Sequence, residues 1–132
     1  MRERTVVYQD DDYDVTITVR QASYSIGLKR SVMMAKQWKM VRTMEEGEVN
    51  PAIVWAILRT YPAVVNATVS IENGEDAKTK LELPTSYEEL LELPEVLVAM
   101  WENAIYEANP AWVPKMKAEE DAEGEAKEPD SA

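Results

Sequence analysis

Apolar and polar side chains alternate along residues 13–20, near the start of the chain. Every second residue from 13 to 19 is apolar, and a shorter run rich in β-branched residues covers 5–8. A period of two is typical of strands that bury one face, and the acidic link 9–12 between the runs predicts a hairpin. The aspartates of this link lack the spacing, glycine and distal glutamate of an EF-hand, so we interpret it as a solvated turn.

Helical spacing follows the predicted hairpin. Residues 23–46 predict one helix that ends near Gly47, and Asn50 caps a second helix with Pro51 in its first turn. Apolar residues at 53, 54, 57, 58 and 61 give that second helix a buried face, which Pro62 interrupts. Segments 68–71 and 79–83 flank Asn73-Gly74, a pairing that predicts a second hairpin.

The C-terminal third contains the clearest helix signals. Ser86 and Glu89 form a capping box for a short helix over 87–92, and Pro94 begins the next helix. The predicted buried face of this last helix contains Leu97, Met100, Trp101, Ala104, Ile105 and Ala108. Asn109-Pro110 ends it, and we expect Trp112 to anchor the chain back onto the fold.

Together these elements predict an α+β fold with an N-terminal β-hairpin, a mainly helical body and a second hairpin. We expect one small domain over 1–114. Residues 115–132 carry seven acids and three lysines, and their largest apolar residue is Met116. Such a segment buries too little surface to offset its chain entropy, so we predict a disordered acidic tail.

Composition excludes several classes of function. The 132 residues include no cysteine and no histidine, and 25 acids against 14 basic residues give a net charge of −11. A disulfide framework, a thiolate zinc site and histidine-based acid–base catalysis are therefore excluded. The negative charge disfavours nucleic acids and anionic membranes. We predict a cytoplasmic, non-enzymatic protein without cofactor or metal, which acts by binding other proteins.

The charges are unevenly distributed. Between residues 15 and 43 every charged side chain is a cation: Arg20, Lys29, Arg30, Lys36, Lys39 and Arg42. This stretch is either a solvated helix face or a docking surface for an acidic partner, which could be the chain's own tail.

The helix predicted over 23–46 is apolar on two sides. Leu28, Val32 and Ala35 occupy one side, and a group of methionines occupies the other. Such a helix is either sandwiched in a core or contacts both its own domain and a partner. Methionine and tryptophan suit partner surfaces. The residues predicted to bind a partner are Met33, Met34, Trp38, Met40, Met44 and Trp55.

Two C-terminal runs resemble the tail assembly chaperones of long-tailed phages. The first run is LPTSYEELLELP over 83–94, and the second is WENAIYEANPAW over 101–112. The resemblance covers 83–112, and the N-terminal hairpin, helical body and charged tail follow the plan of that family. It implies a protein that binds the tape measure protein, keeps this long helical chain soluble and helps to recruit tail-tube subunits. No catalytic residue is implied.

Two other kinds of protein remain open on this composition. One is a small acidic inhibitor whose carboxylates occupy a basic site. The other is a structural component of the phage tail or neck that assembles into a ring.

Overall fold

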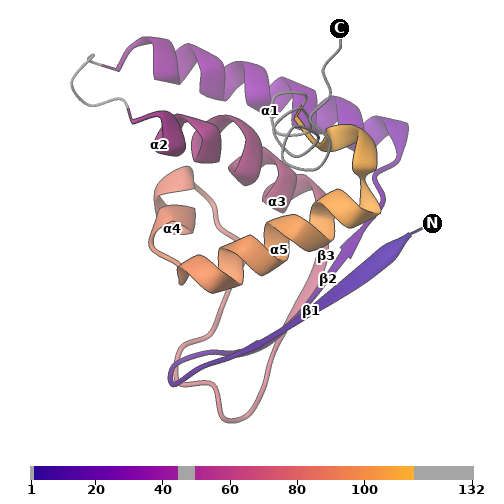
Figure 1. Cartoon of the computed structure of the whole chain (residues 1–132), viewed down its shortest axis with the longest axis vertical. Coiled ribbons are helices and arrows are strands. Elements are labelled where there is room, and N and C mark those ends of the chain that lie inside the picture. Colours follow the sequence, from indigo (N-terminus) through magenta and orange to yellow (C-terminus); the bar gives the residue numbers. More distant parts are fainter. Residues whose placement is uncertain (1, 45–49, 115–132) are drawn as a thin grey trace, which may run out of the picture.

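The computed structural model describes residues 2–44 and 50–114, and its fold is α+β as predicted (Figure 1). Three strands form an antiparallel sheet in the order β1-β2-β3: β1 (Glu3–Gln9), β2 (Asp14–Arg20) and β3 (Thr68–Asn73). The predicted acidic tail over 115–132 lies outside the described residues.

The N-terminal hairpin is confirmed, and Asp10 closes its turn. The Oδ1 atom of Asp10 accepts hydrogen bonds from the backbone N–H groups of Asp12 and Tyr13, at 2.8 and 2.7 Å. The hydroxyl of Tyr8 donates to the other carboxylate oxygen, which lowers the pKa of Asp10 together with these backbone bonds. The alternation along β2 also holds, since Val15, Ile17 and Val19 are buried.

Helix α5 (Glu95–Ala108) covers the apolar face of the sheet and makes most of the core with it. Its buried large side chains are Leu97, Trp101, Ile105 and Tyr106. The indole N–H of Trp101 donates to the Thr68 hydroxyl at 2.9 Å, so the largest buried side chain also has its polar atom satisfied. Met100, which the helical spacing placed on the buried face, is exposed.

Pro62 bends the middle helical layer without ending it. This layer runs without a break through α2 (Pro51–Trp55), a π-helical turn η2 (Ala56–Thr60) and α3 (Tyr61–Ala67). Proline has no N–H to donate to the carbonyl four residues earlier. The helical turn before Pro62 is therefore wider than an α-helical turn: the N–H of Tyr61 bonds to the carbonyl of Ala56, five residues back.

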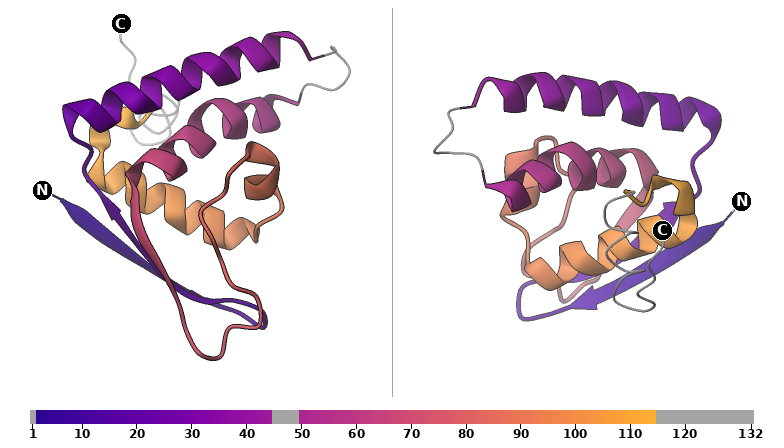
Figure 2. Two further views of the ribbon diagram at one scale, coloured as in Figure 1. Left: turned by 180° about the vertical axis from the view of Figure 1, so that it is seen from behind. Right: turned by 45° about the horizontal axis from the view of Figure 1, so that its top comes forward.

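Helix α1 (Tyr24–Arg42) is the outermost layer, on the side of α2–α3 that faces away from the sheet (Figures 1 and 2). Ser23 caps its start by accepting a hydrogen bond from Ile26 N. The helix ends earlier than predicted, because the Thr43 N–H and hydroxyl both bond to the Met40 carbonyl, at 3.0 and 2.7 Å. The last predicted residues, 45–46, lie outside the described part of the chain.

The prediction of a second hairpin is wrong. Segment 68–71 forms β3, but 79–83 does not pair with it as a strand. Leu81 is held by the Asn73 side chain and not by strand-to-strand backbone bonds: the side chain accepts a hydrogen bond from Leu81 N and donates one to Leu81 O. The loop between Asn73 and Leu81 is bound to the N-terminal hairpin, because the N–H groups of Lys78 and Thr79 bond to the carbonyl of Asp12.

The short helix α4 (Tyr87–Leu91) has the predicted serine cap, with Ser86 Oγ accepting from Glu89 N. The Glu89 carboxylate reaches back one residue further than a standard capping box, to the N–H and hydroxyl of Thr85. These bonds lower the pKa of Glu89. Glu89 therefore acts as a cap, as its position at a helix start predicts.

Asn109 joins the end of α5 to the start of α1. Its side-chain oxygen accepts from Ala22 N at 2.8 Å, and its amide donates to Arg20 O at 3.2 Å and to Ile105 O at 3.1 Å. Asn109 is buried, and two chain segments that are far apart in sequence, 20–22 and 105–109, meet at it. The residue predicted only to end a helix therefore also fixes where α1 starts.

Candidate protein-binding surface

The outer side of α1 carries four large exposed apolar side chains. Tyr24, Leu28 and Val32 follow one another at intervals of four residues and are exposed by 84, 49 and 56%. Trp38, exposed by 51%, lies about four turns beyond Tyr24 and so falls on the same face. Only Val41 is buried among the 19 residues of this helix. We call Tyr24, Leu28, Val32 and Trp38 the outward face.

The inward side of α1 is made largely of methionines. Met33 packs against the core, and its sulfur accepts a hydrogen bond from the Asn66 amide at 3.8 Å. Met34 and Met40 are half-buried, as is Met44, two residues beyond the end of the helix. Helix α1 contacts α3 and η2, so this side mainly attaches the helix to its own domain.

The six residues predicted to bind a partner are therefore not equivalent. Trp38 belongs to the outward face, and Met33 belongs to the packed side. Trp55 is half-buried on α2, and so is more exposed than Trp101, which is buried. The sequence reasoning placed Leu28 and Val32 opposite the methionines but left them, and Tyr24, out of the predicted surface. Their spacing of four residues was the available signal.

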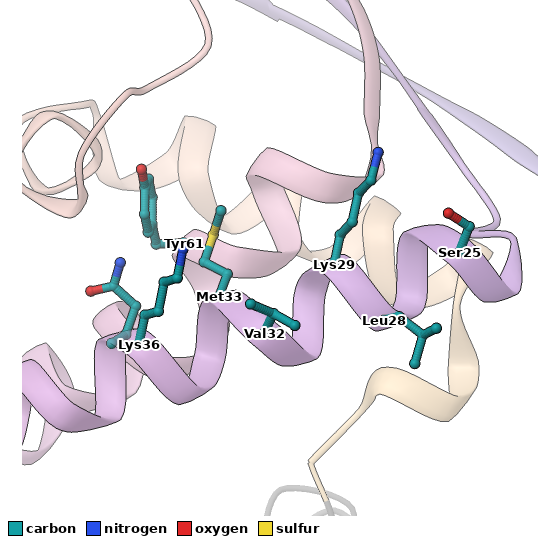
Figure 3. Close-up of a pocket in the computed structure, with 8 residues that line it drawn as sticks. Ser25, Leu28, Lys29, Val32, Met33, Lys36 and Tyr61 are labelled. Atoms are coloured by element: carbon teal, nitrogen blue, oxygen red, sulfur yellow. The ribbon is translucent and has the colours of Figure 1, made fainter.

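A groove of about 500 Å³ runs beside the outward face. Figure 3 shows Met33 of α1 and Tyr61 of α3 lying close together in it, while Leu28 leaves α1 on the opposite side from Lys29. The groove is lined mainly by apolar surface, with Lys29 and Lys36 along one wall. It could hold an apolar side chain of a bound segment next to an acidic one.

Cations surround this apolar surface. Lys29, Lys36, Lys39 and Arg42 all lie on α1, which contains no acid. None of these four forms an ion pair with a carboxylate among residues 2–44 and 50–114. Lys39 and Arg42 also lie in the last turn, where cations interact favourably with the helix dipole.

Arg30, the fifth cation of α1, is directed toward the domain. Its guanidinium carbon lies 4.4 Å from the centre of the Trp112 ring, in the short helical turn η3 (Pro110–Trp112). Burial lowers the pKa of Arg30, and Arg59 adds to that effect. This stacking confirms Trp112 as the anchor that follows α5 and places it beside α1.

A polar cluster lies between the helical layers. Glu102 accepts hydrogen bonds from the hydroxyls of Thr60, at 2.7 Å, and Tyr106, at 3.4 Å. Burial, with the nearby charge of Glu102, raises the pKa of the Tyr106 phenol well above its ordinary range. A phenol that holds its proton this firmly suits a structural hydrogen bond better than proton transfer at neutral pH.

Within the described part of the chain, no group of three or more acidic, histidine or cysteine side chains is placed to hold a metal ion. No helix there is long and apolar enough to cross a membrane.

Comparison with known proteins gives no relative. No family model matches the chain, and neither a curated protein nor a solved structure does.

Proposed function

We propose that this chain is a non-enzymatic tail assembly chaperone of long-tailed phages. It binds the tape measure protein through the outward face of α1, keeps that protein soluble and helps to recruit tail-tube subunits. The similarity of residues 83–112 to this family suggests the partner, and the outward face offers a surface that such a partner could use.

The observation that carries the proposal is the uncovered apolar surface of α1. Four large apolar side chains on the outer side of this helix are exposed by 49–84%, although the same helix contributes one buried residue to its own domain. Contiguous apolar patches on soluble domains mark interaction sites. An aromatic residue at each end of the patch, Tyr24 and Trp38, adds the residue types that are enriched at binding hot spots.

The shape and charge of the surface favour a helical ligand. A helix that buries an apolar stripe would lie along α1 and insert side chains into the groove beside Met33 and Tyr61. The lysines at its edge, which form no ion pair with another described residue, favour acidic residues flanking that stripe. A long helical chain with exposed apolar stripes needs such a cover until it is assembled.

Co-expression tests this function. The tape measure protein of the same genome would be produced alone, with the wild-type chain, and with a Leu28→Glu/Trp38→Glu variant. We expect the wild-type chain to raise the soluble fraction and to co-purify, and the variant to do neither. A matched control, Val7→Glu/Val96→Glu, places the same charges at two other exposed apolar positions and should behave as wild type.

Equal rescue by both variants would contradict a role for the outward face, and no rescue by the wild-type chain would contradict the function itself. Particles purified from infected cells separate the chaperone from a structural tail or neck component. A chaperone should be absent from purified particles, whereas a structural component should be found in them as a ring.

A further inference from the structure

The lysines of α1 lack an acidic partner in the described structure. Lys29 and Lys36 line the groove, and Lys39 and Arg42 continue the positive charge to the end of the helix. The folded domain is acidic overall, yet its two ion pairs among described residues, Arg4–Glu107 and Arg20–Glu3, lie elsewhere. A surface with this charge attracts an acidic segment.

The described part of the chain ends close to α1. Trp112 stacks with Arg30 of α1, and Pro114, the last described residue, is buried. The segment 115–132 therefore follows directly on a part of the chain that contacts α1, on the side of Arg30. Its seven acids against three lysines give it the charge opposite to that of the helix.

The segment is long enough to follow the whole helix. Its 18 residues span up to roughly 60 Å when extended, at about 3.3–3.6 Å per residue. The 19 residues of α1 measure roughly 28 Å, at about 1.5 Å per residue. A segment tethered this close reaches an effective concentration in the millimolar range, so weak ion pairs are sufficient to hold it.

Two other occupants fit less well. A second copy that pairs its α1 with this one would bring two rows of cations together, at a cost in repulsion. Nucleic acid carries the right charge for α1 but meets a chain of net charge −11.

We propose that residues 115–132 bind the lysine-bearing flank of α1 as an intramolecular acidic ligand. The contact is electrostatic and is made in the free chain. Any partner that uses this flank then competes with the tail, which protects the surface before assembly. The inference goes beyond the proposed function, because it requires no tape measure protein.

Zero-length cross-linking of the full chain tests the contact directly. A carbodiimide joins a lysine amine to a carboxylate only where the two touch. We expect links from the acids of 119–130 to Lys29, Lys36 and Lys39 at low ionic strength. These links should be lost at high ionic strength, because salt then screens the attraction between charges more than a few ångströms apart. Lys78 and Lys80, exposed in the loop after β3 at the opposite end of the molecule from α1, are the reference sites (Figure 1).

A several-fold excess of tail links to the α1 lysines over Lys78 and Lys80 supports the proposal, and equal yields at both sites overturn it. Mixing chains labelled with light and heavy nitrogen gives the second control. Links that join light to heavy chains would assign the tail to a neighbouring copy and contradict an intramolecular contact. Since no partner is present, failure of the proposed function leaves this result standing.

Discussion

Helices α5 and α1 use their apolar residues in opposite ways. Helix α5 buries six of its 14 residues against the sheet, whereas α1 buries one of 19. The apolar residues of α5 repeat on one face, and those of α1 surround the helix. Most helix stability in proteins comes from packing an amphipathic face, so α5 stabilises the fold, whereas the outer side of α1 contributes little to it.

The largest difference in stability is expected between substitutions of the two tryptophans, Trp101 on α5 and Trp38 on α1. Trp101→Ala on α5 should lower the free energy of unfolding by about 3–5 kcal/mol, because it leaves a cavity in the core and removes the hydrogen bond to the Thr68 hydroxyl. Trp38→Ala on α1 should change it by less than about 0.5 kcal/mol. Urea unfolding measures both, and similar losses would remove the distinction between the helices.

A smaller loss is expected where the two helices are joined. Asn109→Ala removes the bonds to Ala22, Arg20 and Ile105, and we expect a cost of about 1–3 kcal/mol because buried backbone groups lose their partners. Asn103→Ala, an exposed asparagine on α5, is the matched control. If both variants unfold at the same urea concentration, Asn109 does not act as a clamp.

The two sides of α1 can be compared at neighbouring residues. Met33→Ala should cost about 1–2 kcal/mol, below the value for a fully buried methionine, because Met33 is only partly covered. Val32→Ala should cost less than about 0.5 kcal/mol, since Val32 is exposed. The reverse order in thermal or urea unfolding would mean that the outward face is packed in solution.

The smallest effect concerns alkaline pH. Burial raises the pKa of Tyr106 above its ordinary value of 10.0, so folding favours the neutral phenol. This contribution is fully present below pH 10 and is lost as the pH rises toward the folded-state pKa. The free energy of unfolding of Tyr106→Phe should therefore fall less steeply above pH 10 than that of the wild type. Some pH dependence should remain in the variant, because burial also raises the pKa of Tyr61. Parallel curves for the two proteins would argue against this origin.

Local patterns predicted much of the fold. The alternation along β2, the Asn50-Pro51 start of the second helix and the Ser86 cap depend on neighbours in sequence, and all three were found. The second hairpin failed because the partner of Leu81 is the Asn73 side chain, not a strand. The bonds of this loop to the carbonyl of Asp12, far away in sequence, also hold 79–83 away from β3 and outweigh the turn signal.

The candidate surface was only partly predictable. Helical spacing separates the Leu28 side of α1 from the methionine side, but nothing local says which side the domain covers. In the structure α3 packs against the methionine side of α1, where Met33 contacts the core. The role of Asn109 was also hidden, because it depends on bonds to Arg20 and Ala22, nearly 90 positions away.

One affinity comparison tests the central claim that the outward face of α1 binds the partner. Val32→Glu and Val7→Glu make the same change at residues exposed by 56 and 65%, one on α1 and one on β1. Calorimetric titration with a helical fragment of the tape measure protein should show at least about tenfold weaker binding for Val32→Glu, which corresponds to about 1.4 kcal/mol, and wild-type binding for Val7→Glu. Equal affinities for the two variants would contradict the claim.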